Sequence, residues 1–344
     1  MCGLFGFIGD SKNPELSHEL STELFIRTQS RGIDASGFYC TENFNSKKIN
    51  YYKKPVPAVD FVKTKEYESL WNNNLNLGLF HCRAASIGVG IPAFNQNNHP
   101  FVSKDLKKAV IHNGVITRHE YEYFKQYYEV ETECDSEIFL RILEQEDSFA
   151  EKAKIFFSHA KLSHYAVAFS ENTETDRKLH LFRNEHRPLV VIDLLDDLNQ
   201  IFFCSTIPIF FEAVDGIKTK LKKTKVYEIP TSHYMCIEYD ESGKFNIEEY
   251  KIKTKEQLAP NSVSQFYSIK KDHSDWQNNI KEEFNSMKEV LLFQAEKLLS
   301  QAHYVHLNYL QDSILDSNAK TAMVFNCIKD INKRLENLVK QIDS

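Results

Sequence analysis

The glycines of this chain are distributed very unevenly, and this constrains the fold more than any other feature of the sequence. Nine of the eleven glycines lie in the first 114 residues, and the last one is Gly243. The rest of the 344-residue chain contains no glycine and one proline, Pro260. Because glycine permits the tight turns that join short strands, the pattern predicts a turn-rich first part followed by a helical second part.

Short apolar runs bounded by turn residues recur throughout the first part, and such runs are typical of β-strands. Four segments with helical spacing lie between them, at residues 15–29, 118–128, 136–145 and 149–161. Many short strands with two groups of helices predict packed layers of sheet and helix rather than a parallel βαβ series. The expected strands are residues 4–8, 37–40, 77–82, 109–112, 166–170, 179–183, 189–193, 201–205 and 235–239.

The second part follows a polar stretch at residues 251–268 and shows amphipathic helical patterns. We therefore divide the chain into a first domain at residues 1–255 and a helical C-terminal region at residues 256–344. The helices either fold back on each other or on the first domain, or they bind a partner protein or a second copy of the chain. The apolar positions are Ile280, Phe284, Met287, Leu291 and Leu298, and then Ile328, Ile331, Leu335, Leu338 and Ile342.

Composition and charge exclude several classes of protein. The chain is 42% hydrophobic with a formal net charge of -6, so it lacks the basic excess typical of nucleic-acid-binding proteins, and only a local basic patch would permit such binding. No apolar run approaches the roughly 20 residues that span a bilayer, and the first residues lack the basic region and long apolar core expected of a signal peptide. Seven scattered cysteines without a CxxC pair and thirteen dispersed histidines predict reduced thiols and no metal site. We expect a cytoplasmic protein.

Cys2 directly follows the initiator methionine, and a cysteine at this position can act as a catalytic nucleophile. If Met1 is removed, the chain begins with a thiol beside an α-amino group that titrates near pH 8. That amine can take the thiol proton, so one residue supplies both nucleophile and base. A cysteine in second position also occurs without any catalytic role, and the rest of the sequence has to decide between these interpretations.

Two further segments carry arginines in suggestive places. Residues 31–37 form a polar loop bounded by glycine, which alone indicates only a charged turn. Residues 77–86 read as an apolar strand that ends in Arg83. The planar guanidinium at that position suits bidentate binding of a carboxylate, and Ser86 adds a hydroxyl group. The alternative is an arginine that extends from the sheet edge into solvent.

Two more segments have both a structural and a functional interpretation. Asn113-Gly114 lies between apolar runs and is a strong signal for a hairpin turn. The same pair can point a side-chain amide and a backbone N–H at one oxygen, as an oxyanion hole does. Asp135 precedes a helical pattern and suits an N-cap. Its carboxylate can also bind the ammonium group of a ligand.

Together these segments resemble the class II glutamine amidotransferase domain of the N-terminal-nucleophile hydrolases, most closely that of glucosamine-6-phosphate synthase and its relatives. The resemblance covers roughly residues 2–215. It implies an α+β fold with a four-layer αββα sandwich, which the α-helical C-terminal region follows in this chain. The matching segments are residues 2–8, 31–37, 81–86, 112–114 and 134–138, with weaker likeness at 182–189 and 203–206.

The resemblance implies a role for each of these residues. Cys2 would be the nucleophile with its own amine as base, and Asn113 with the Gly114 N–H would form the oxyanion hole. Arg83 and Ser86 would bind the α-carboxylate of glutamine, and Asp135 its α-amino group. Arg31, Asp34 and His112 would hold the surrounding backbone. Many family members carry tryptophan, threonine and histidine where Ala84, Ala85 and Ser86 stand here, which puts glutamine affinity in question rather than the reaction type.

The leading hypothesis is a glutaminase subunit that supplies ammonia to a separate protein, because nothing after residue 250 resembles a synthase domain. The helical C-terminal region would then bind that partner or form a homo-oligomer. The chemistry needs no cofactor. Two alternatives stay open: a hydrolase that acts alone on a γ-glutamyl or other small amide, and an inactive structural protein that retains the fold.

Overall fold

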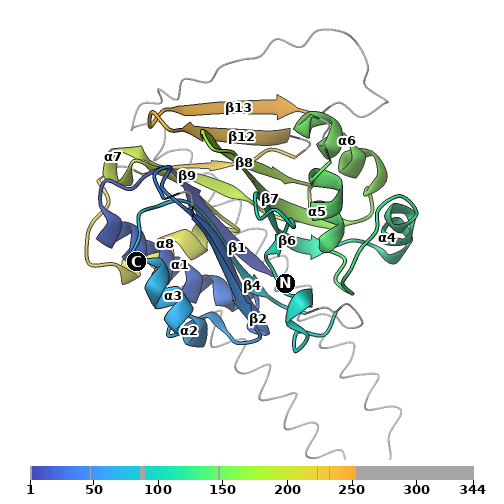
Figure 1. Ribbon diagram of the computed structural model, residues 1–344, viewed down its shortest axis with the longest axis horizontal. Helices are drawn as coiled ribbons and strands as arrows, with labels where there is room; N and C mark the ends of the chain where they lie inside the picture. Colours follow the sequence, from blue (N-terminus) through green and yellow to red (C-terminus); the bar gives the residue numbers. More distant parts are fainter. Residues whose placement is uncertain are drawn as a thin grey trace, which may run out of the picture. The chain divides into compact units, whose positions relative to one another are not determined.

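The computed structural model describes residues 2–46, 48–85, 90–145, 148–222, 224–231 and 233–252 (Figure 1). The predicted domain boundary at residue 255, the helical C-terminal region, Met1 and Ser86 lie outside the described residues. In the described part of the chain, no helix is long and apolar enough to cross a membrane.

The first sheet has β1 at its centre. Its strand order is β11-β9-β10-β1-β4-β2-β3, and every neighbouring pair is antiparallel. All residues of β1 and β4 are buried, because helices cover one face of this sheet and the second sheet covers the other. The strands are β1 (Gly3–Ile8), β2 (Ala35–Glu42), β3 (Ile49–Lys54), β4 (Leu75–Arg83), β9 (Val190–Leu194), β10 (Gln200–Cys204) and β11 (Lys225–Glu228).

The second sheet is also antiparallel, with the strand order β13-β12-β8-β7-β6-β5. Its strand β6 lies against β1 and β4 of the first sheet. This contact brings β6, which carries Asn113 and Gly114, against β4, which ends at Arg83. The strands are β5 (Phe101–Val102), β6 (Lys108–Val115), β7 (His164–Asn172), β8 (Asp176–Arg183), β12 (His233–Asp240) and β13 (Phe245–Lys251).

Helices cover the outer face of each sheet (Figure 1). Helices α1, α2, α3 and α8 contribute to the core of the first sheet, and α4, α5 and α6 to that of the second. Two 3-10 turns, η1 (Gln29–Arg31) and η2 (Asn95–Asn97), lie in loops. The helices are α1 (Pro14–Thr28), α2 (Ala58–Phe61), α3 (Lys65–Leu70), α4 (Arg118–Lys125), α5 (Glu137–Leu143), α6 (Phe149–His159), α7 (Leu195–Leu198) and α8 (Ile207–Gly216).

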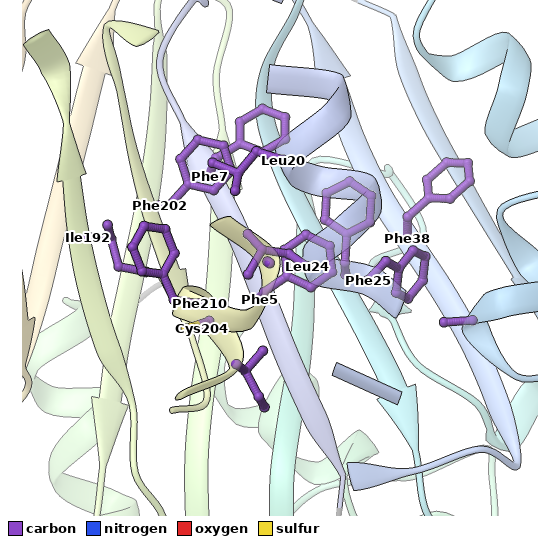
Figure 2. Packing of buried hydrophobic residues seen from close by; sticks show 14 of the residues in the cluster. Phe5, Phe7, Leu20, Leu24, Phe25, Phe38, Ile192, Phe202, Cys204 and Phe210 are labelled. Atoms are coloured by element: carbon purple, nitrogen blue, oxygen red, sulfur yellow. The ribbon is translucent and has the colours of Figure 1, made fainter. Parts of the chain in front are cut away.

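Three buried clusters hold these layers together. Figure 2 shows the first, in which aromatic side chains of β1 pack against Leu24 of α1 and Phe210 of α8. Phe5 stacks on Phe80 of β4 with ring centroids 4.6 Å apart. A second cluster lies between the second sheet and its helices, and a third fills the space between the two sheets. The order of layers is therefore helix, sheet, sheet, helix.

The predicted packing of strands and helices in layers, rather than a parallel βαβ series, is confirmed for the described residues. Each of the nine expected strands and four expected helices overlaps an observed element. The sequence analysis missed the sheet-edge strands β3, β5, β11 and β13, together with the short helices α2, α3 and α7 and the ten-residue helix α8. Edge strands are exposed on one side, so their sequences are less apolar than those of β1 and β4.

Candidate active site

Cys2 lies directly before the central strand β1, and its side chain is buried. Its Sγ lies 3.4 Å from the backbone N and 3.5 Å from the backbone O of Ala84. Its carbonyl oxygen accepts a hydrogen bond of 3.0 Å from Nε of Arg31. Because Gly3 pairs with Cys82 in the register of β1 and β4, Cys2 falls beside the end of β4.

Burial raises the pKa of the Cys2 thiol, while the hydrogen bond with Ala84 and the positive charge of Arg83 oppose the rise. A thiol with a raised pKa is protonated at neutral pH, and the thiolate is the nucleophilic form. Reaction at Cys2 therefore needs a base close to the sulfur.

The loop at residues 31–37 holds the backbone that follows β4. The N–H of Asp34 donates to the carbonyl of Arg83 at 2.9 Å, and its Oδ2 accepts from the N–H of Ala85 at 2.7 Å. A Cβ atom on Gly32 would lie 2.4 Å from the backbone of Arg83 and of Ala84, so this close approach requires glycine. The loop thereby fixes the peptide that contacts the Cys2 sulfur.

Arg83 ends β4 and is only 3% exposed. Its Nη1 donates to Oδ1 of Asn98 at 2.7 Å, and its Nη2 donates to the carbonyl of Gly90 at 2.8 Å. Nη2 also lies 3.9 Å from the sulfur of Cys134. The alternative of an arginine that extends into solvent is wrong, because side-chain and backbone oxygens hold the guanidinium inside.

Asn113 and Gly114 lie within β6 and pair with β7, so the hairpin interpretation is wrong. A Cβ atom on Gly114 would lie 1.7 Å from the carbonyl oxygen of His164, which excludes any larger residue there. Asn113 is fully buried, and neither atom of its side-chain amide has a hydrogen-bond partner among the described residues. A buried amide is costly to leave without a hydrogen bond, so this side chain is suited to bind a ligand group.

Asp135 is 7% exposed, and its Oδ2 accepts a hydrogen bond of 2.8 Å from the N–H of Ile116. It does not cap the helix as expected, because α5 begins at Glu137 with Ser136 as the N-cap. Burial raises the pKa of the Asp135 carboxyl, and the hydrogen bond from Ile116 opposes this. A cation beside the carboxylate would favour its charged form.

Buried histidines join the two sheets behind these residues. Nδ1 of His112 lies 2.8 Å from Oγ of Ser136, and Nε2 of His81 lies 2.9 Å from the carbonyl of His112. The rings of His81 and His99 stack at 3.9 Å. Burial lowers the pKa of His81 and of His112 to about 3, so both rings are neutral at pH 7 and act as packing and hydrogen-bonding groups.

Sequence reasoning missed several residues that support Arg83. The side-chain oxygen of Asn98 accepts a hydrogen bond from the Arg83 guanidinium. Lys53 of β3 donates to the backbone oxygens of Asn98 and Pro100 at 2.6 and 3.1 Å. Cys134 lies between Arg83 and Asp135, with its sulfur 3.8 Å from Oδ1 of Asp135. The signal in the sequence is the run Asn95-Gln96-Asn97-Asn98, which indicates a loop but does not show which side chain it contacts.

The structure brings the predicted residues to one end of the facing sheets. Both Arg83 and Asp135 act electrostatically on the Cys2 thiol. Asn113 and Gly114 lie on β6, which packs against β1 and β4. The N–H of Ile116, two residues after Gly114, donates to Asp135. Ser86 lies outside the described residues. In the described part of the chain, no group of side chains is suited to hold a metal ion.

The chain is similar in sequence to proteins named glutamine–fructose-6-phosphate aminotransferase (isomerizing). It is 28% identical over 224 residues to that of Thermococcus kodakarensis, which is 63% of this chain and 34% of the relative. It is 26% identical over 215 residues to that of Bacillus subtilis, which is 58% of this chain and 32% of the relative. The chain thus spans about a third of the length of these relatives. No family model matches it.

Among solved structures, the chain is similar to the glutamine phosphoribosylpyrophosphate amidotransferase of B. subtilis. The TM-score is 0.51 at 18% identity, over 73% of this chain and 49% of that one. The predicted resemblance to class II glutamine amidotransferase domains is confirmed. The chain is therefore similar in sequence to these aminotransferases, and its two antiparallel sheets share the fold of the B. subtilis amidotransferase.

Proposed function

We propose that this protein hydrolyses the side-chain amide of glutamine through a thioester on Cys2 and supplies the ammonia to a separate protein. The observation that supports this best is the convergence of a buried thiol, a buried guanidinium and a buried carboxylate at one end of the two sheets. A free amino acid carries the complementary charges on its α-carboxylate and α-ammonium groups. The four-layer N-terminal-nucleophile sandwich is part of the same proposal.

Arg83 would bind the α-carboxylate of glutamine, since a guanidinium offers five N–H donors in a fork that matches a carboxylate. Asp135 would bind the α-ammonium group. The arriving cation offsets the burial that raises the pKa of Asp135, so binding and ionisation of the carboxyl group favour each other. The two contacts together would orient the side-chain amide toward Cys2.

The α-amino group of Cys2, exposed after removal of Met1, would take the thiol proton. The thiolate then forms a bond to the amide carbon, and the amide oxygen becomes an oxyanion held by the Asn113 amide and the Gly114 N–H. The protonated amine returns its proton to the leaving nitrogen as the carbon–nitrogen bond breaks, which releases ammonia. Water next cleaves the thioester to glutamate, with the same amine as base.

The test is ammonia release from glutamine by the purified full chain, with intact mass to show whether Met1 is removed. We expect turnover that Cys2→Ala abolishes. Cys236→Ala is the matched control, because Cys236 lies on β12 outside the proposed site and should retain full activity. A processed, folded chain without turnover would contradict the proposal and favour an inactive structural protein.

A second candidate is hydrolysis of a γ-glutamyl amide with a larger leaving group. The small side chains of Ala84 and Ala85 beside Cys2 favour it, because they leave more room than the tryptophan and threonine expected there. Comparison of kcat/KM for glutamine and for γ-glutamyl-p-nitroanilide decides between the two. A higher kcat/KM for the anilide would mean that a γ-glutamyl amide, and not glutamine, is the preferred substrate.

A further inference from the structure

A partly buried arginine, Arg187, lies in the segment that joins the second sheet to the first. This segment runs from the end of β8 at Arg183 to the start of β9 at Val190. Nη1 of Arg187 donates to the carbonyl of His186 at 2.8 Å, whereas Nε is buried and has no hydrogen-bond partner among the described residues. A buried guanidinium N–H is costly to leave without an acceptor, so Arg187 is suited to bind an anion.

The strand register places Arg187 at the same end of the first sheet as Cys2. Cys204 of β10 pairs with Phe5 of β1 on one side and with Val190 of β9 on the other. Cys2 and Arg187 each come three residues before these partners, and β1 and β9 run in the same direction because both are antiparallel to β10. Two strand spacings, roughly 10 Å, separate the lines of the two strands. An arginine side chain and a bound molecule can together bridge that gap.

The charges at this end support the proximity of Arg187 and Cys2. Burial lowers the pKa of Arg187, and the charge of a Cys2 thiolate opposes this change. Nε of Arg31 donates to the carbonyl of Cys2 at 3.0 Å, and the pKa of Arg31 is lowered by burial and then by the charge of Arg187. The acidic residue of the turn, Glu185, is exposed to solvent. An anion bound beside Arg187 would therefore reduce the repulsion between two guanidinium groups.

Arg187 differs from the arginine at the other end of its segment. Arg183 forms an ion pair of 2.8 Å with Glu228, so its charge is compensated. Arg187 forms no ion pair within the described parts of the chain. Its neighbours His164 and His186 have rings 4.1 Å apart, and burial lowers the pKa of His164, as do the charges of His186 and Arg187. The surroundings of Arg187 are thus electropositive.

The strand order puts Arg187 and Arg83 on opposite sides of Cys2. β4, which ends at Arg83, is next to β1 on one side, and β10 followed by β9 lies on the other. In the proposed function, Arg83 binds the α-carboxylate of the substrate and the amide carbon lies at the Cys2 sulfur. A substrate that extends from Arg83 across Cys2 directs its leaving nitrogen toward Arg187. The ammonia that leaves glutamine has no charge for this guanidinium to bind.

We propose that the same site also cleaves γ-glutamyl peptides, in which the leaving amine carries a carboxylate that Arg187 binds. This activity rests on the thioester chemistry proposed above and adds a substrate class to it. The Cys2 thiolate forms a bond to the γ-carbonyl carbon, the carbon–nitrogen bond breaks, and the α-ammonium group of Cys2 gives its proton to the leaving amine. Water then cleaves the thioester, which releases glutamate and restores the thiol.

Two substrates of similar size that differ by one charge test this proposal. The leaving amine of γ-glutamylglycine carries a carboxylate, whereas that of γ-glutamylethylamide carries a methyl group. Glutamate release by the purified full chain, with removal of Met1 checked by intact mass, gives kcat/KM for both and for glutamine. We expect kcat/KM to be at least tenfold higher for γ-glutamylglycine than for γ-glutamylethylamide, because only the carboxylate forms charge-assisted hydrogen bonds with a guanidinium.

Arg187→Gln should lower kcat/KM for γ-glutamylglycine at least tenfold more than kcat/KM for γ-glutamylethylamide. Arg27→Gln is the matched control, because it removes the same charge from α1, where the Arg27 guanidinium binds Glu23 of the same helix. It should leave the ratio of the two kcat/KM values unchanged. An equal loss for both substrates in Arg187→Gln would mean that Arg187 acts on the Cys2 thiol or on folding, and would overturn the proposal.

Binding to the Cys2→Ala chain, measured by calorimetry, separates recognition from chemistry. We expect γ-glutamylglycine to bind at least tenfold more tightly than γ-glutamylethylamide, and Arg187→Gln to abolish the difference. Equal affinities in the Cys2→Ala chain would exclude the carboxylate contact. Turnover of glutamine without any preference for γ-glutamylglycine overturns the peptide activity alone. Failure of a processed, folded chain to turn over any of the three substrates overturns the proposed function as well.

Discussion

At the scale of single residues, the site contains a buried amide without a hydrogen-bond partner and a glycine at which no side chain fits. Asn113 keeps a buried amide without partners in the described structure, and Gly114 has no room for a side chain. Such unfavourable features are retained where a bound ligand or transition state forms the missing hydrogen bonds. Four substitutions separate these costs from the function.

Asn113→Ala should lower kcat for glutamine about 100- to 1000-fold, the usual loss for one oxyanion-hole donor. Stability should stay the same or rise, because the substitution removes a buried amide that has no partner in the folded protein. Urea unfolding beside the ammonia assay checks both. A large loss of stability would instead assign Asn113 a structural role.

Gly114→Ala should unfold the end of β6, since its Cβ would lie 1.7 Å from the His164 carbonyl oxygen. We expect a loss of about 3 kcal/mol or more in the free energy of unfolding. Gly243→Ala is the control, because Gly243 also has a positive φ but its added Cβ atom would lie 3.7 Å from Oη of Tyr239, an ordinary van der Waals contact. It should cost about 1 kcal/mol for backbone strain alone. Equal losses would contradict the steric argument.

Asp135→Asn should stabilise the free protein at pH 7 and weaken glutamine binding. Burial raises the pKa of this carboxyl above its unfolded value of 3.8, so the wild type loses stability as pH rises through the folded pKa. The asparagine retains an oxygen for the Ile116 N–H and does not ionise. Urea unfolding at pH 4 and pH 7 should show the gain only at pH 7, and KM for glutamine should rise at least tenfold. An unchanged KM would remove Asp135 from the substrate site.

At the scale of elements, a buried charge cluster ties α6 to the second sheet. Glu171 at the end of β7 lies 3.1 Å from Nε2 of His180 on β8 and 3.6 Å from Nζ of Lys152 on α6. Lys152 also donates to the carbonyl oxygens of Leu143 and Gln145, which end α5. The Glu171 carboxylate on β7 thus links β7, β8 and α6.

Glu171→Gln should cost a few kcal/mol of stability at pH 7. Although burial raises the pKa of Glu171, the contacts with His180 and Lys152 outweigh it and lower the pKa to about 2. The stabilisation is therefore present above the unfolded pKa of 4.5 and is lost as pH falls toward 2. Thermal unfolding of both proteins between pH 7 and pH 2.5 checks this, and a difference that does not shrink on acidification would contradict it.

Elements were predictable where burial made their sequences distinctive. The runs that form β1 and β4 are apolar because both faces of these strands are covered. By contrast, β3 reads Ile-Asn-Tyr-Tyr-Lys-Lys and forms a half-exposed edge, so its sequence resembles a loop. Asp135 was expected to cap a helix, and the capping rule failed because the N–H of Ile116 on another segment binds its carboxylate.

At the scale of the whole molecule, the motifs predicted which residues belong to the site but not what supports them. Cys2, Arg83 and Asp135 could be selected from residue type and order along the chain. Asn98 and Lys53 could not. Asn98 binds Arg83 from a loop without periodicity, and Lys53 on β3 binds the backbone of that loop. Sequence patterns report burial and turns, whereas such contacts arise only when distant segments meet.

The antiparallel topology also separates the two ends of the sheets. The turn between β12 and β13 lies at the end opposite to Cys2, because Asp240 pairs with the first residue of β8 while the last residue of β8 lies beside the start of β7. A Cβ atom on Gly243 in that turn would lie 3.7 Å from Oη of Tyr239, so the turn is not tightly packed. A fluorescent domain inserted after Ser242 would therefore report on assembly of the protein in living cells without obstructing the site.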